Sequence, residues 1–267
     1  MKLRRKKAGI VWWLALGKYF IPPGAQLQET NTGRTLVLDG DIAHYLLHVM
    51  RLTPGTEIIF CDGQRMDYPA VMTGADIKKR LCTFMLSDPV SCNTEPFTHV
   101  TLYQGLPKGD KLDSIIQKCV ELGVSRIIPV STARAVARPK DTDKKIARYQ
   151  RIAEAAASQS LRGVVPQVCA AAAFTQAVSA STICVPAPLC LVAYENEHQR
   201  TITSLGTTRP PGPVHLWVGP EGGFTDEEIA TLTCHGALPI SLGRRILRTE
   251  TAGMAMLAML ACLWGEL

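Results

Sequence analysis

Residues 216–225 read LWVGPEGGFT, and this stretch decides how the second half of the chain is interpreted. An apolar run, Leu216 to Val218, stops at a turn rich in glycine, and an acidic segment then follows Thr225. Thr225 and Glu228 have the spacing of a capping box, in which each side chain bonds the other residue's backbone N–H at a helix start. The pattern predicts a strand, a tight loop and a helix, the setting in which open parallel sheets bind ligands.

The composition of this glycine loop restricts the ligand. A phosphate-binding loop offers a lysine and open backbone amides, whereas the central residue here is Glu221. The glycines at 219, 222 and 223 also lack the G-x-G-x-x-G spacing of a dinucleotide site. The loop therefore favours a nucleoside without phosphates, one that carries positive charge, and a valine at Gly222 is expected to intrude on it. A turn without a ligand is the alternative.

A second glycine loop, SLGRRILRTETAG at 241–253, also follows a predicted strand. Gly243 provides the turn, and arginines at 244, 245 and 248 crowd it. Because both loops follow strands of one predicted sheet, we expect them to line a shared pocket, acidic on the first side and basic on the second. The alternative is a solvated basic loop ahead of a helix.

The second half of the chain alternates strands and helices. Asp110 is placed to cap a helix with apolar residues at helical spacing, and Gly123 can end it. Strands are expected at 99–106, 125–130, 189–194, 215–218 and 239–242, and helices at 110–123, 143–160, 225–234 and 250–264. This order predicts an α/β domain with a parallel sheet.

The first part of the chain has a different pattern. Between residue 18 and about residue 87, short β-type segments alternate with turns, and one helix is expected at 41–50. Residues 88–96, DPVSCNTEP, have the composition of a linker. Residues 1–17, MKLRRKKAGIVWWLALG, form a basic and apolar extension, for which a signal-like segment, a basic arm and a start-site artefact all remain open.

Charge and cysteine usage limit the function classes. The extension supplies five of the +6 net charges, so any nucleic-acid binding by the remainder depends on a local patch. The nine cysteines include no C-x-x-C pair, which argues against structural zinc and a disulfide framework and favours the cytoplasm. His44 and His48 lie four residues apart without a nearby third ligand, so no metal is expected.

Two further segments suggest partners. The last helix, 250–264, is apolar nearly all round, which predicts that a second subunit covers part of it; a fully internal helix in a monomer is the alternative. Basic residues concentrate at 134–151, where they form a plausible phosphate-binding face or, alternatively, a solvated helix face.

Taken together, GPEGGFTDEE at 219–228 and LGRRILRTETA at 242–252 resemble the paired C-terminal motifs of the RsmE family, the 16S rRNA uridine-N3 methyltransferases of the SPOUT superfamily. Similar segments are HYLLHVMR at 44–51, QGLPKGDKLDSIIQKCVELGVSRIIPV at 104–130, the Arg134 segment, and Gln159 with Arg162. The resemblance runs from residue 18 almost to the C-terminus. Tyr45, in place of a second histidine, and Ser158, in place of a common acid, depart from it.

The resemblance implies a PUA-like RNA-binding β-barrel at 18–92 and a SPOUT methyltransferase domain at 93–267 whose chain end forms a trefoil knot. It implies S-adenosylmethionine as cofactor, no metal, no membrane, a homodimer, and 16S rRNA of the small ribosomal subunit as partner. Cofactor contacts are implied for Val218, Gly219, Glu221, Gly222, Leu242, Gly243, Ile246, Leu247, Arg248 and Thr249. RNA contacts are implied for His44, Arg51, Lys108, Arg134, Gln159 and Arg162.

The implied reaction moves a methyl group from a sulfonium to uracil N3, whose proton must leave. Arg134 and Arg248 are the candidate catalytic cations, which would stabilise negative charge on the ring. Glu221, and by chemistry also Glu250, is a candidate general base. Two alternatives remain: a SPOUT methyltransferase acting on another RNA position, and a non-catalytic RNA-binding or ribosome-assembly factor.

Overall fold

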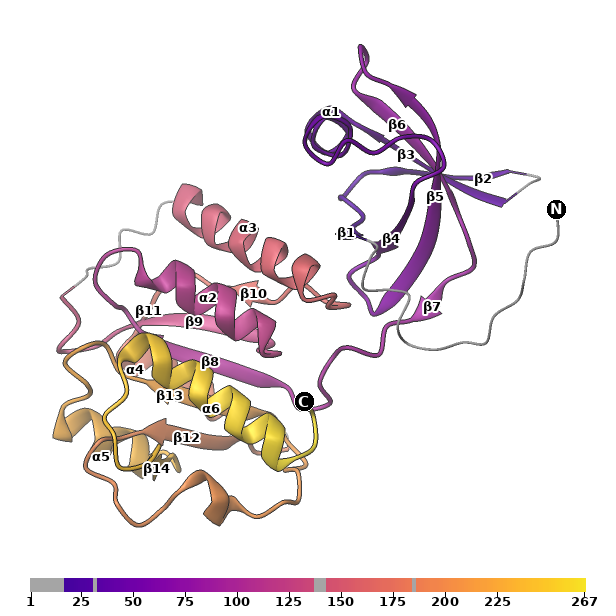
Figure 1. Cartoon of the computed structure of the whole chain (residues 1–267). Coiled ribbons are helices and arrows are strands. Elements are labelled where there is room, and N and C mark those ends of the chain that lie inside the picture. The colour runs from indigo at the N-terminus through magenta and orange to yellow at the C-terminus, as the bar shows by residue number, and fades with distance from the viewer. Residues whose placement is uncertain (1–16, 31–32, 137–142, 184–185) are drawn as a thin grey trace. The chain divides into compact units, whose positions relative to one another are not determined.

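The computed structural model describes residues 17–30, 33–136, 143–183 and 186–267, and Figure 1 gives its helices and strands. The chain divides into two compact units. The first unit comprises the residues up to Thr94 together with Leu161–Val164, and the second comprises Glu95–Ser160 and Val165–Leu267. The division falls two residues after the predicted boundary and adds a four-residue segment that the sequence did not indicate. The predicted extension, except Gly17, lies outside the described residues.

The first unit is built on one seven-stranded sheet in the order β1-β4-β5-β6-β3-β2, with β7 paired to β5. The pairs are antiparallel except β1 with β4. The predicted β-rich domain is therefore confirmed. The strands are β1 Lys18–Phe20, β2 Gln26–Thr30, β3 Gly33–Asp39, β4 Glu57–Cys61, β5 Met66–Asp76, β6 Leu81–Leu86 and β7 Val90–Ser91.

The helix expected at 41–50 forms in two parts, α1 Gly40–His44 and the π-helical turn η2 Tyr45–Val49. In the π-helical turn the Met50 N–H donates to the carbonyl oxygen of Tyr45 at 3.0 Å, five residues back instead of four. Leu46 and Leu47 are buried in the same core as Phe60 and Phe84, so the helix is held by packing on the sheet.

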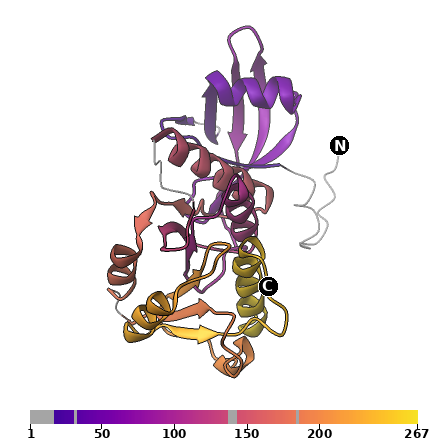
Figure 2. The same cartoon turned by 90° about the vertical axis from the view of Figure 1, so that its left-hand side faces the viewer.

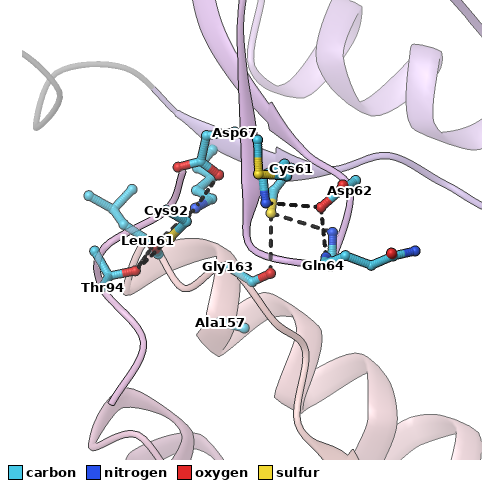
Figure 3. A network of polar contacts seen from close by, with 12 residues as sticks. Cys61, Asp62, Gln64, Asp67, Cys92, Thr94, Ala157, Leu161 and Gly163 are labelled. Carbon is cyan, nitrogen blue, oxygen red and sulfur yellow. Dashed lines mark hydrogen bonds and ion pairs between the residues drawn. The ribbon is translucent and has the colours of Figure 1, made fainter. Parts of the chain in front are cut away.

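A buried ion pair ties the segment Leu161–Val164 into the first unit (Figure 3). The Lys18 side chain is 1% exposed, and its Nζ lies 2.7 Å from Asp67 Oδ1. The same Nζ donates to the Leu161 carbonyl oxygen at 3.1 Å, and Thr94 Oγ1 donates to that oxygen at 2.7 Å. Burial lowers the pKa of Lys18, but the hydrogen bond to Asp67 and the electrostatic influence of Cys92, Cys61 and Asp67 outweigh burial, so the pKa is raised overall. Lys18 is therefore charged at neutral pH.

The second unit is a parallel sheet with helices on both faces, which confirms the predicted α/β class. The strand order is β10-β9-β8-β13-β12-β14, with β11 paired to β9, and every pair is parallel. The strands are β8 Val100–Gly105, β9 Arg126–Ser131, β10 Gln167–Val168, β11 Ala172–Ala173, β12 Leu189–Ala193, β13 Val214–Val218 and β14 Leu238–Ile240.

The helices of the second unit form two layers, with α4 and α5 on one side of the sheet and α6 on the other (Figure 2). Trp217 of β13 is buried with residues of α4 and α5, whereas Gly253 of α6 lies against Leu102 of β8. The helices are α2 Lys111–Glu121, α3 Asp143–Gln159, α4 Phe174–Ser181, the 3-10 turn η3 Ile202–Leu205, α5 Asp226–Cys234 and α6 Thr249–Leu263.

Two local predictions for helix starts can be compared with the structure. The capping box is confirmed, because Thr225 Oγ1 accepts from the Glu228 N–H and Glu228 Oε2 accepts from the Thr225 N–H. Asp110 occupies the cap position of α2, but its side chain makes no capping hydrogen bond, so that prediction is wrong in its chemistry. The trefoil knot stays a prediction.

We expect Lys18→Met to lower the free energy of unfolding of the first unit by about 3–5 kcal/mol, because it leaves the Asp67 carboxylate without its buried cation. Hydrogen exchange followed by mass spectrometry on the full chain should show loss of protection in β4, β5 and residues 161–164. Lys79→Met removes an ion pair with Asp76 whose lysine side chain is 79% exposed, and it serves as the control. Equal protection in Lys18→Met and wild type would contradict the stabilising role of the pair.

Candidate functional site

A cavity of about 710 Å³ lies at the carboxyl ends of β12, β13 and β14. Three loops line it, one after each of these strands: residues 193–198, 218–223 and 241–252. Lys111 of α2 completes the lining. This volume is in the range of small-molecule sites, and the carboxyl edge of a parallel sheet is where such sites occur.

The two loops predicted to share a pocket both line this cavity. All ten residues predicted to contact a cofactor are among its lining residues, namely Val218, Gly219, Glu221, Gly222, Leu242, Gly243, Ile246, Leu247, Arg248 and Thr249. Ile246 is 86% exposed, so its side chain points largely to solvent in this chain. The geometry brings these residues together, and their contacts with a ligand stay a prediction.

The first loop approaches the end of β8 so closely that glycine is required there. A Cβ atom at Gly105 would lie 2.5 Å from the Pro220 backbone nitrogen and 2.9 Å from the Gly219 carbonyl carbon. A Cβ at Gly219 would in turn lie 2.9 Å from the carbonyl carbon of Gly223. These backbone contacts leave no space for a side chain, so the glycines fix the path of the loop along the cavity wall.

Arg134, which follows β9, holds the first loop from outside the cavity lining. Its Nη1 donates to the carbonyl oxygens of Gly222 at 2.9 Å and Phe224 at 3.1 Å. A Cβ at Gly222 would lie 3.2 Å from the Arg134 side chain, so a valine there would also press on Arg134, and its intrusion on a ligand stays a prediction. The structure therefore gives Arg134 a contact with the loop itself.

Glu228 also joins the glycine loop to the segment after β9, but as a hydrogen-bond acceptor where Arg134 is a donor. Its carboxylate is buried, and Oε1 accepts from the Ala133 N–H at 2.8 Å while Oε2 accepts from the Thr225 N–H at 3.0 Å. Arg134 donates to the glycine loop, whereas its neighbour Ala133 donates its N–H to Glu228 of α5, the helix that follows the loop. The loop is thus held by hydrogen bonds in both directions.

Glu221 is engaged with the start of α2. Its carboxylate accepts from the Lys108 N–H at 3.1 Å and from Lys111 Nζ at 2.8 Å, and Glu250 Oε2 lies 3.4 Å from the same Nζ. Burial raises the pKa of Glu221, but hydrogen bonds from Lys111 and from backbone N–H groups outweigh burial and leave the pKa lowered. A carboxylate held in this way stays ionised and is a weaker proton acceptor.

The third loop of the cavity was missed by the sequence analysis. Tyr194, Glu195, Asn196 and His198 line the cavity, and the Tyr194 hydroxyl donates to Asp226 Oδ1 at 3.0 Å. Glu195 Oε1 lies 2.7 Å from the position of a Cβ at Gly223, so the carboxylate rests on that glycine. The sequence did contain one indication of this loop: the strand expected at 189–194 ends at the same edge of the sheet as the other two.

The residues predicted to contact RNA differ in exposure. His44 is half-buried, with its ring centroid 4.4 Å from that of His48, and Arg51, Lys108 and Gln159 are exposed. Arg162 is only 3% exposed, so its guanidinium is buried here, and its contact with RNA stays a prediction.

The predicted basic segment 134–151 lies partly outside the described residues, at 137–142. Arg148, in its described part, is ion-paired with Asp113. Within the described part of the chain, no group of three or more His, Cys, Asp or Glu side chains is arranged to hold a metal ion.

Two family models match the chain. One is described as an RNA methyltransferase domain and matches residues 93–261, which include the whole cavity lining. The other is described as an RNA methyltransferase PUA domain and matches residues 38–82 of the first unit.

The chain is also similar to individual proteins. It is 34% identical over 248 residues to the ribosomal RNA small subunit methyltransferase E of Bacillus subtilis strain 168, covering 90% of this chain and 94% of the relative. Its identity to the protein of the same name from Synechocystis is 35%, covering 86% of this chain and 73% of the relative. The crystal structure of the Neisseria gonorrhoeae methyltransferase E bound to S-adenosyl methionine has a TM-score of 0.80 and 31% identity, covering 93% of this chain and 98% of that chain.

We expect Arg134→Ala to loosen the first loop, because the carbonyl oxygens of Gly222 and Phe224 lose their donor. Amides of residues 219–228 should exchange faster by about tenfold, corresponding to a net hydrogen-bond contribution of about 1.4 kcal/mol. The control is Arg151→Ala, since the Arg151 Nε donates only within its own helix, to the Ala147 carbonyl oxygen at 3.3 Å. Unchanged exchange in the loop of Arg134→Ala would show that the two hydrogen bonds do not hold it.

Proposed function

The chain belongs to the ribosomal RNA small subunit methyltransferase E family, and from this premise we propose that it transfers the methyl group of S-adenosylmethionine to a uridine N3 atom of 16S ribosomal RNA. The family resemblance predicted from the sequence is thereby confirmed. The observation that carries the proposal is the single cavity lined by both glycine loops, in a fold that resembles a relative bound to S-adenosyl methionine.

The described residues fit this cofactor. The glycines at 219, 222 and 223 line the cavity, and its volume of about 710 Å³ suits a ligand of the size of an adenosyl group. Lys111 is held between Glu221 and Glu250 and is not presented to a phosphate group. Carboxylates on the first and third loops, Glu221 and Glu195, suit a positively charged ligand, and the arginines of the second loop suit a ligand carboxylate.

When bound, the cofactor supplies an electrophilic methyl group on a sulfonium centre. The cavity walls would hold that methyl group in line with the target nitrogen, and such positioning contributes on the order of 7–11 kcal/mol in favourable cases. Arg248 lines the cavity and is exposed, so its guanidinium is available to stabilise negative charge on a uracil carbonyl oxygen.

Existing hydrogen bonds restrict the roles of the other proposed catalytic residues. Arg134 acts in this proposal through the loop it holds, since its Nη1 donates to the carbonyl oxygens of Gly222 and Phe224. Of the two candidate bases, Glu250 is the better placed, because Glu221 already accepts from Lys108 and Lys111 and has a lowered pKa. Glu250 would accept the N3 proton as the uracil nitrogen attacks the methyl carbon.

We further propose that the protein is a homodimer that acts on the small ribosomal subunit in the cytoplasm. The apolar helix α6 leaves Met259 and Cys262 exposed, which supports a second copy as its cover. The eight cysteines among the described residues are free, in keeping with a reducing compartment. His44, Arg51, Lys108 and Gln159 are the proposed RNA contacts. Of the helices in the described part of the chain, none has the length and apolar character needed to cross a membrane.

The proposal is tested by mass-spectrometric mapping of 16S rRNA from cells that lack this protein, before and after the purified protein and S-adenosylmethionine are added to their small subunits. We expect a missing 3-methyluridine that reappears. A different missing nucleotide would assign another RNA position. Unchanged rRNA, together with no calorimetric binding of S-adenosylmethionine, would favour a non-catalytic RNA-binding factor.

We expect Gly105→Ala to weaken binding of S-adenosylmethionine by about 10–100-fold, since a Cβ forced against the Pro220 nitrogen displaces the first loop at a cost of about 1–3 kcal/mol. The control is Gly253→Ala in α6, where the nearest atom to the new Cβ would be Leu102 Cδ2 at an ordinary 3.5 Å. Titration calorimetry compares the two variants with wild type. Wild-type affinity in Gly105→Ala would place the cofactor away from this loop.

A further inference from the structure

Gln104, the penultimate residue of β8, lies beneath the cavity and is fully buried, with 0% exposure. Its side-chain Nε2 donates to the Gly105 carbonyl oxygen at 3.0 Å and to Thr249 Oγ1 at 2.9 Å. Thr249 Oγ1 donates in turn to the Gly219 carbonyl oxygen at 2.6 Å. Gly219 begins the first glycine loop, and Thr249 lies in the second loop segment as the first residue of α6, so three residues remote in sequence form one hydrogen-bonded chain.

The direction of this chain is fixed by the number of protons available. A threonine hydroxyl has one proton, and the Gly219 carbonyl oxygen can only accept, so the Thr249 proton points to Gly219. Thr249 Oγ1 must then accept from its other neighbour, which requires the NH₂ group of Gln104. Turning the amide over would set Gln104 Oε1 against the Gly105 carbonyl oxygen and leave Thr249 with two acceptors for one proton. A single arrangement therefore satisfies these atoms.

The remaining atom of the amide suggests a role beyond stability. Gln104 Oε1 is buried and has no hydrogen-bond partner among the described residues. A buried acceptor without a donor destabilises a fold, and an apolar side chain of similar size would avoid that cost. The amide contributes what an apolar side chain cannot, a donor to Thr249 and through it a fixed distance between the two loops.

We propose that Gln104 is a positioning residue for the cofactor, acting through Thr249 to hold the two glycine loops at the separation that S-adenosylmethionine binding requires. The proposal rests on the proposed function and adds a residue that does not line the cavity. Without the amide, no donor orients the Thr249 hydroxyl. The hydroxyl is then free to rotate, and its hydrogen bond to the Gly219 carbonyl oxygen is weakened. The cavity then widens between the first and second loops.

The test compares Gln104→Met, Thr249→Val and the double variant by titration calorimetry with S-adenosylmethionine. Each single variant should weaken binding by about tenfold, the effect of one buried hydrogen bond. Because Gln104 acts through Thr249, the double variant should be no weaker than Thr249→Val. Thr249→Ser keeps the hydroxyl and should restore binding to within about twofold of wild type. In methyl-transfer assays the KM for S-adenosylmethionine should rise, with the KM for RNA unchanged.

The control is Ser181→Ala, which removes a buried hydroxyl that donates to the Val178 carbonyl oxygen within α4, away from the cavity lining. Its cofactor affinity should equal that of wild type. Wild-type affinity in Gln104→Met would overturn the proposal, as would a double variant whose loss is the product of the two single losses. If the wild-type protein itself does not bind S-adenosylmethionine, the proposed function fails, and that result is distinct from failure of the variants to differ.

Discussion

The close approach of β8 to the first glycine loop is the constraint on which the site depends. With only 2.5 Å between the Pro220 nitrogen and the place where a Gly105 Cβ would stand, the two backbones are in direct contact. That contact brings the neighbouring residue, Gln104, within 2.9 Å of Thr249 Oγ1. The second loop is consequently fixed by the same strand end as the first. A side chain at residue 105 would separate the strand from one loop and, through Gln104, from the other.

Charged side chains at the site are used mainly to hold its shape. Arg134 donates to two loop carbonyl oxygens, Glu228 accepts from two backbone N–H groups, and Lys111 lies between two carboxylates. Each of these charges has a local partner, which limits the cost of desolvating it near the cavity. The exposed arginines at 244, 245 and 248 differ, since they line the cavity on a loop that faces solvent. These three arginines are therefore available to an anionic substrate.

The features that could be predicted from the sequence are those that depend on neighbouring residues or on the order of the strands. The capping box of Thr225 and Glu228 formed because both partners lie within one helical turn. The two glycine loops meet because parallel strands present their carboxyl ends at one edge. Features that depend on packing were not predictable. The buried state of Arg162 and the additional residue in the π-helical turn at Tyr45 are set by contacts across the fold, and no local pattern marks them. The short elements β10, β11 and α4 were missed for the same reason. The third loop at Tyr194 differs, since the predicted strand before it ends at the same sheet edge, but its own residues carry no glycine motif.

The distribution of charge around the cavity gives a physical reason for a sulfonium cofactor in a protein that acts on a polyanion. Lys111 with Glu221 and Glu250 leaves one net negative charge beside the first loop, and Glu195 adds a second on the third loop. The arginines of the second loop set positive charge on the remaining side. A ligand that is cationic at its reactive centre is attracted to the acidic side, while RNA phosphates are repelled there and attracted to the arginine loop. The two reactants of the proposed reaction would therefore be drawn to different sides of one cavity, and the target base would reach the methyl group from the arginine side.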